Sequence, residues 1–129
     1  MVDDSELWRR HLRGILHKHP RWEVVAEAAT GVEAVQKAAA VKPDLILLDI
    51  EMPIQSGIAA AREILAADPQ SRILFVSTHR SPALVGAALE TGARGYLLKS
   101  DAHQLVDVMD AVAGGHRFIS DGLTRDEGE

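Results

Sequence analysis

The 129-residue chain contains no cysteine, which excludes disulfide bonds and thiolate metal sites. It also lacks any apolar run near the roughly 18 residues that cross a membrane. Acidic residues stand early in the chain where a signal peptide would have its apolar segment, so we expect a cytoplasmic protein. Basic residues are in deficit, at 14 against 19 acidic ones, and a net charge of −5 does not favour nucleic acid binding by the surface as a whole.

Segments with strand and helix patterns alternate along the chain. Apolar residues at helical spacing predict helices over residues 7–16, 31–41, 57–67, 82–91 and 105–112. Apolar runs predict strands over residues 1–2, 22–28, 45–49, 73–76 and 96–98. Such alternation predicts βαβ units, and right-handed crossovers then place helices on both faces of a parallel sheet. We therefore expect a doubly wound α/β domain with five strands, the first truncated to two residues.

The most informative segment is the apolar run that ends at Asp49. Residues 45–48 are all large and apolar, and the run lies between Pro43 and Pro53. A short continuous apolar run is typical of a strand buried on both faces. Asp49 then lies at the carboxyl edge of the sheet, where open α/β proteins bind ligands. For an isolated aspartate, a helix cap or loop position would be the simpler interpretation.

Polar side chains follow the other strands at the same edge. They are Asp3 and Asp4 after the first strand, Ser77 and Thr78 after the fourth, and Lys99 after the fifth. Carboxylates brought close together repel one another and favour a cation. Hard oxygen ligands suit Mg²⁺, which also takes a phosphate oxygen. With a hydroxyl and an ammonium, the set can hold a phosphoryl group, and a carboxylate can be the nucleophile that accepts it.

These motifs, in this order, resemble the receiver domain of two-component response regulators. The resemblance runs from Val2 to about Ile119 and rests on Asp3-Asp4, Leu47-Leu48-Asp49-Ile50-Glu51-Met52-Pro53 with Gly57, Ser77, and Gly95-Tyr96-Leu97-Leu98-Lys99. It implies a flavodoxin-like (βα)5 fold with strand order 2-1-3-4-5. Residues 92–100 and 113–115 resemble the branch that precedes a LuxR-type helix-turn-helix.

The same resemblance implies a domain organisation. Residues 1–119 would form the receiver domain, and residues 120–129 a polar tail. Residues 123–127 resemble the opening of a LuxR-type DNA-binding domain, although a match this short also arises by chance. The tail is therefore a candidate start of a linker to a DNA-binding output domain.

The resemblance also implies roles at the acceptor. Asp49 is the expected phospho-acceptor, and Asp3 and Asp4, with Asp49 and the backbone carbonyl of Glu51, would hold Mg²⁺. Ser77 and Lys99 would contact phosphoryl oxygens. The simpler alternatives are a solvated terminus for the acidic pair, a turn hydroxyl for Ser77 and a surface cation for Lys99.

Further residues would switch and tune the domain. Ser77 and Tyr96 match the hydroxyl and the aromatic that move together on activation, although Tyr96 could also be a plain strand aromatic. Glu51, Thr78 and His79 occupy the variable positions that tune phosphoryl lifetime. Thr78 is bulkier than the small residue often found at its position, which bears on the entry of phosphate donors.

The implied function is a signalling switch. A sensor histidine kinase would donate a phosphoryl group to Asp49, and the domain would change conformation to control an output, transcription in the full-length protein. Two alternatives stay open: an inert receiver-like interaction domain, and an aspartyl-phosphate hydrolase, which needs an aspartate where Glu51 stands. Many such receivers form homodimers, and apolar surface for one is offered by Leu84, Leu89, Val106 and Phe118. No nucleic acid contact is expected from this domain itself.

The N-terminus is short for a central strand. Only Met1 and Val2 precede Asp3, where three or four more buried apolar residues are usual. Each contributes roughly 1.5–3 kcal/mol, so about 5–10 kcal/mol would be missing, comparable with a typical domain's whole stability. Neighbouring strands would also keep unpaired backbone groups. We expect that the natural protein begins several residues upstream, or that another segment fills the gap.

Overall fold

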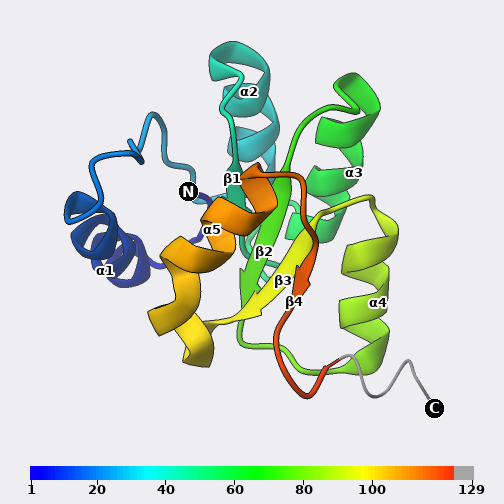
Figure 1. Ribbon diagram of the computed structural model, residues 1–129. Helices are drawn as coiled ribbons and strands as arrows, with labels where there is room; N and C mark the ends of the chain where they lie inside the picture. Colours follow the sequence, from blue (N-terminus) through cyan, green and yellow to red (C-terminus); the bar gives the residue numbers. More distant parts are fainter. Residues whose placement is uncertain (124–129) are drawn as a thin grey trace.

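The computed structural model describes residues 1–123. Its elements, in chain order, are α1 Glu6–His17, α2 Gly31–Val41, β1 Ile46–Leu48, α3 Gly57–Ala67, β2 Ile73–Ser77, α4 Pro82–Glu90, β3 Gly95–Leu98, the 3-10 helix η1 Lys99–Gln104, α5 Leu105–Ala113 and β4 Phe118–Ile119 (Figure 1). Thr30 and Ser81 cap α2 and α4, since their hydroxyls accept from the backbone N–H groups of Glu33 and Leu84. Within residues 1–123, none of the helices combines the length and apolar character needed to cross a membrane.

The sheet is parallel, with the order β1-β2-β3-β4. Val2 extends it beyond β1 by parallel bridges to Leu48 on one side and Ala28 on the other. The Val2 N–H donates to Leu47 (2.8 Å), and the Val2 carbonyl accepts from Asp49 (3.0 Å). From Ala28 through Val2 to β3, the spatial order is therefore the predicted 2-1-3-4-5, in a doubly wound α/β fold.

Two details of the sheet differ from the prediction. Residues 22–28 were expected to form a strand, but only Ala28 makes a bridge, to Val2, because residues 22–27 have no ladder partner. Val25, the expected strand centre, is 52% exposed. At the opposite edge, β4 adds a short parallel strand beside β3, with Phe118 opposite Gly95. Two apolar residues in a polar stretch show no periodicity, so sequence analysis did not predict this strand.

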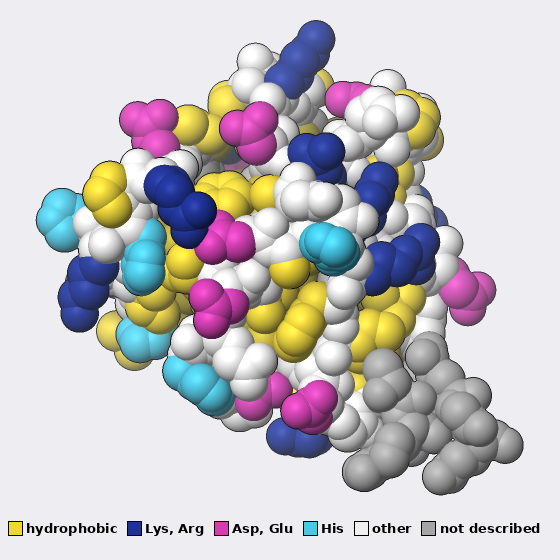
Figure 2. Space-filling model, in the orientation of Figure 1, with side chains coloured by type: hydrophobic (Ala, Val, Ile, Leu, Met, Phe, Trp, Pro, Cys, Tyr) yellow, Lys and Arg dark blue, Asp and Glu magenta, His cyan; other side chains and the backbone are white. Residues whose placement is uncertain are grey.

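Strand side chains alternate between two apolar cores. Leu47, Leu74, Val76 and Leu97 pack against α1 and α5 on one face. On the other face, Leu48, Phe75, Tyr96 and Leu98 pack against α2, α3 and α4. Figure 1 shows these two helical layers, and Figure 2 shows apolar side chains in the seam between α1 and α5. Because helices cover both faces of the sheet, side chains on both sides of each strand are buried, and the strand sequences are continuous apolar runs.

Packed structure continues after β4. Ser120 is fully buried; its N–H donates to the Tyr96 carbonyl, and its Oγ accepts from the Leu98 N–H, each at 2.9 Å. Leu123, 4% exposed, joins the core on the α2–α4 side. The stretch that resembles a LuxR-type opening lies outside the described residues from Thr124 onward.

A slot of about 600 Å³ lies beside Met1 and Val2. It runs between the 22–28 segment and β1, and its apolar walls include Leu16, Leu45 and Met109. The Met1 ammonium donates to the Ala26 carbonyl (3.1 Å) at this slot, and burial lowers the pKa of that ammonium. The first residue of the chain therefore lies at the edge of this slot.

Candidate functional site

Asp49 is the first residue after β1 and is held tightly by its backbone. It is 8% exposed, and its N–H donates to the Val2 carbonyl. Gly57, the first residue of α3, lies against it: a Cβ there would stand 1.7 Å from the Asp49 carbonyl oxygen. The Gly57 N–H also donates to the Ile50 carbonyl at 2.7 Å. Glycine is therefore required at position 57 for the acceptor loop and α3 to meet.

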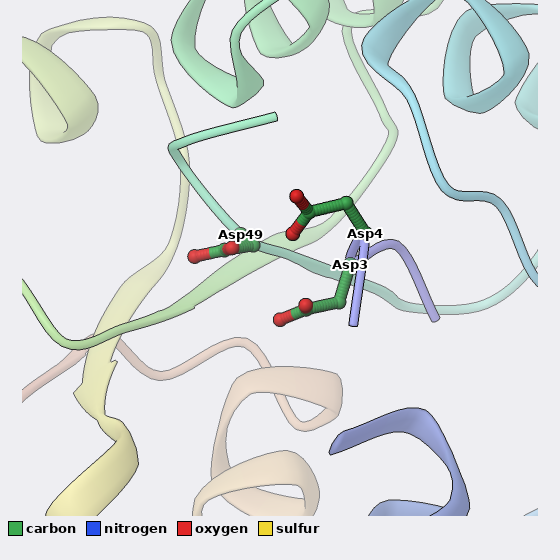
Figure 3. Close-up of side chains that lie close together, drawn as sticks. All are labelled: Asp3, Asp4 and Asp49. Carbon is green, nitrogen blue, oxygen red and sulfur yellow. The ribbon is translucent and has the colours of Figure 1, made fainter. Parts of the chain in front are cut away.

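Three carboxylates gather at this edge of the sheet. Ligand oxygens of Asp3, Asp4 and Asp49 all lie within 4.8 Å of one another. Figure 3 shows their side chains reaching toward the same space from the N-terminal segment and the end of β1. Asp3 is 3% exposed and Asp49 nearly as buried, whereas Asp4 faces solvent. The interpretation of Asp3 as part of a solvated terminus is therefore wrong.

Lys99 brings the only positive charge that ion-pairs with this cluster among residues 1–123. Its Nζ lies 2.7 Å from Asp3 Oδ2 and 3.8 Å from Asp49 Oδ2, and its side chain is 17% exposed. Lys99 is thus no surface cation. It bridges Asp3 and Asp49, and lies closer to Asp3.

The charge at the site is not fully balanced by Lys99. Burial and then the charge of Asp3 raise the pKa of Asp49 to about 6, with Lys99 offsetting only part of the rise. Asp3 Oδ2 is buried, and its contact with Lys99 lacks hydrogen-bond geometry, so it has no hydrogen-bond donor among the described residues. Buried, underbalanced carboxylate oxygens of this kind fit a hard divalent cation such as Mg²⁺.

Ser77 and Tyr96 meet at one residue. Ser77, at the end of β2, is fully buried, and its Oγ accepts from the His79 N–H (3.1 Å). Tyr96 on β3 is also fully buried, and its hydroxyl donates to the His79 carbonyl (2.8 Å). Burial raises the pKa of Tyr96. The two residues expected to move together therefore both hold the backbone of His79.

The expected tuning residues Glu51, Thr78 and His79 lie in the loops that follow β1 and β2. Thr78 is exposed, and His79 Nε2 lies 2.7 Å from Glu51 Oε1. This contact connects the loop after β1 with the loop after β2. The sequence placed both residues at the same edge of the sheet, and this shared position was the only indication of their contact. The contact itself was not predicted. The role expected for the Glu51 carbonyl stays a prediction.

The sequence is similar to those of known proteins. The transcriptional regulatory protein DegU of Brevibacillus brevis is 38% identical over 125 residues, which are 96% of this chain and 53% of DegU. A protein-glutamate methylesterase/protein-glutamine glutaminase of Vibrio parahaemolyticus is 46% identical over 100 residues, 77% of this chain and 27% of that protein. The chain thus spans about half of the first relative and about a quarter of the second.

Structural comparison agrees with the sequence comparison. The crystal structure of a LuxR-family two-component response regulator from an Aurantimonas species superposes with a TM-score of 0.93 at 34% identity, over 99% of this chain and 95% of that one. The family model of the response regulator receiver domain matches residues 1–110. The chain therefore belongs to the response regulator receiver family, in the branch of the LuxR-type regulators.

Proposed function

We propose that Asp49 accepts a phosphoryl group from a phosphohistidine on a sensor kinase. The observation that carries this proposal is a buried carboxylate at the end of β1, set between the Lys99 ammonium and two further carboxylates. An Asp49 oxygen attacks phosphorus, and the P–N bond to the donor imidazole breaks as the new O–P bond forms. The imidazole leaves with the bonding electron pair and takes a proton from solvent. The product is an acyl phosphate on Asp49.

The surrounding residues prepare this step. At neutral pH, a pKa of about 6 leaves Asp49 mostly ionised and able to attack. Asp3 and Asp4, with Asp49 and the Glu51 carbonyl, would hold Mg²⁺, which supplies charge neutralisation to phosphoryl oxygens when bound. Lys99, whose Nζ lies 3.8 Å from Asp49 Oδ2, would offer a second positive charge to those oxygens. Catalysis of this kind is mostly positioning and charge balance.

Phosphorylation would bias a conformational equilibrium through Ser77. The Ser77 hydroxyl, whose Oγ accepts from the His79 N–H, would turn its own O–H to donate to a phosphoryl oxygen, and this movement would change its contact with His79. Since Tyr96 also binds His79, movement of that loop changes the contacts of Tyr96. The Tyr96 carbonyl in turn holds Ser120, so the change reaches the chain that follows β4. We infer control of an output domain by this route, with transcription as the output in the full-length protein.

The partners follow from this proposal. The donor is a cytoplasmic sensor histidine kinase, which makes this a cytoplasmic signalling domain and not a metabolic enzyme. The net charge of −5 argues against nucleic acid contact by this domain itself. Homodimerisation would use half-buried apolar side chains at α4, α5 and β4, namely Leu84, Leu89, Val106 and Phe118. Sedimentation with and without beryllofluoride tests it: a monomer in both states at high concentration would contradict the dimer.

Intact mass spectrometry after incubation with Mg²⁺ and acetyl phosphate tests the acceptor. The protein should gain the mass of one phosphoryl group, and Asp49→Asn should not. Asp44→Asn, at the other end of β1, is the matched control and should be labelled like the parent. A hydrolase would instead release phosphate with many turnovers, and an inert domain would gain no mass. Equal labelling of Asp49→Asn would refute the assignment.

A further inference from the structure

We propose that Trp8 is a positioning residue for phosphoryl transfer, because its indole ring holds the Lys99 ammonium in place between Asp3 and Asp49. This inference rests on the proposed function of Asp49. Lys99 Nζ lies 4.9 Å from the centroid of the Trp8 ring. A cation over an indole face is attracted by the negative face of the ring, and more strongly where water is excluded. Here the lysine side chain is only 17% exposed.

The first turn of α1 fixes the indole over the site. Ser5 caps this helix, and its Oγ accepts from the Trp8 N–H (3.1 Å). The Ser5 N–H in turn donates to Asp3 Oδ1 (2.9 Å). The Trp8 ring also packs against the core formed with Leu12 and Leu105. The carboxylate that faces Lys99 and the ring that covers Lys99 are therefore parts of one hydrogen-bonded turn.

The geometry explains why Lys99 needs such a partner. A lysine side chain is flexible, and its ammonium is a compact charge with no fixed orientation. Lys99 Nζ lies 2.7 Å from Asp3 but 3.8 Å from Asp49, so the carboxylates alone draw it away from the acceptor. The ring restricts the ammonium to a place from which it reaches both. Without the ring, the Lys99 ammonium is less restricted in position, and a phosphoryl group on Asp49 loses part of its charge partner.

Plain core packing is the competing explanation for Trp8, and kinetics separate the two. Trp8→Leu keeps apolar bulk and removes the ring, whereas Trp8→Phe keeps a ring with a weaker attraction for cations. Trp22→Phe is the control, since Trp22 packs in the same core but does not contact Lys99. Its Nε1–H donates to Asp110 Oδ1 (2.9 Å) instead. Each variant is checked for folding by its melting temperature.

The measurement compares the rate of Asp49 labelling by acetyl phosphate with the affinity for Mg²⁺, read from NMR shifts of the Asp4 and Asp49 amides. Trp8→Leu should label about fivefold more slowly, as expected for one lost cation–π contact. Trp8→Phe should lie between Trp8→Leu and the parent, and Trp22→Phe should match the parent. Mg²⁺ affinity should stay within about twofold throughout, because carboxylates and not Lys99 hold the ion.

A spectroscopic arm uses the two tryptophans of the chain. In Trp22→Phe, Trp8 is the single reporter, and its emission should change on saturation with Mg²⁺ and beryllofluoride as Lys99 shifts toward Asp49. Wild-type labelling rates in Trp8→Leu would overturn the inference, as would equal losses of rate and Mg²⁺ affinity, which indicate a structural role. Absence of labelling in the parent protein would instead overturn the proposed function.

Discussion

Replacing Asp49 by asparagine should stabilise the domain at neutral pH while abolishing phosphorylation. Ionised Asp49 is unfavourable in the folded protein, because burial and the neighbouring Asp3 raise its pKa from 3.8 to about 6. A group with a raised folded-state pKa binds more protons in the folded state. Its contribution to stability is complete below pH about 4 and is lost as the pH rises through about 6.

The size of the effect follows from the shift. A rise of about two units corresponds to about 3 kcal/mol once Asp49 is ionised in both states. Asparagine has a similar shape and does not titrate, so it avoids this cost. The free energy of unfolding of Asp49→Asn, relative to that of wild type, should increase by about 1.4 kcal/mol from pH 5 to pH 8. This is the part of the total effect that develops over that pH range.

Urea unfolding of both proteins across this pH range, without divalent cations, measures the difference directly. Asp44→Asn removes the same charge at the other end of β1 and supplies the baseline. A stability difference between Asp49→Asn and wild type that stays constant from pH 5 to pH 8 would refute the electrostatic reasoning. So would a loss of stability in Asp49→Asn at pH 8.

Three further changes test other parts of the structure. Asp4→Ala should remove the amide NMR shifts that Mg²⁺ causes near Asp49; an unchanged titration would refute the site. Gly57→Ala should lower the free energy of unfolding, measured in urea, by several kcal/mol, because the new Cβ would stand 1.7 Å from the Asp49 carbonyl oxygen. Gly86→Ala is the control: no atom lies within 4 Å of its new Cβ, and the change should stabilise α4 by about 0.5–1 kcal/mol. An apolar segment of about five residues fused before Met1 should fill the slot and raise the melting temperature, unlike a Gly/Ser segment of equal length.

The main elements were predictable because local signals and tertiary structure agree. Residues 46–48 and 73–76 are apolar runs buried on both faces, and the helices carry caps such as Ser81. The prediction of a strand over residues 22–28 was wrong, because a strand forms only beside a paired neighbour, which a local pattern cannot reveal. The edge strand β4 depends on Ser120, whose side chain and N–H bond to β3, a long-range contact with no local signature.

The acceptor site was predictable as a set of strand ends, but its side-chain contacts were not. Asp49 and Ser77 follow apolar runs, so the common edge of a parallel sheet brings them together. Trp8 showed only as part of the apolar stripe of α1, and nothing local indicated that its ring covers Lys99. The Glu51–His79 contact likewise depends on how two loops lie. Residue types indicate the chemistry of the site, whereas pairings between loops come from the folded chain.

Locally unfavourable features occur in the loop that carries the acceptor. Ile54, in the loop after Asp49, has φ of +73° and is 84% exposed, a costly combination for a β-branched residue. Its neighbour Gln55 is held against Gly31, where a Cβ would stand 2.3 Å from the Gln55 carbonyl. The acceptor loop is therefore fixed by close contacts while it carries backbone strain and underbalanced charge. Because the two apolar cores supply stability elsewhere, the site can remain in a state that a cation or a change of charge at Asp49 relieves.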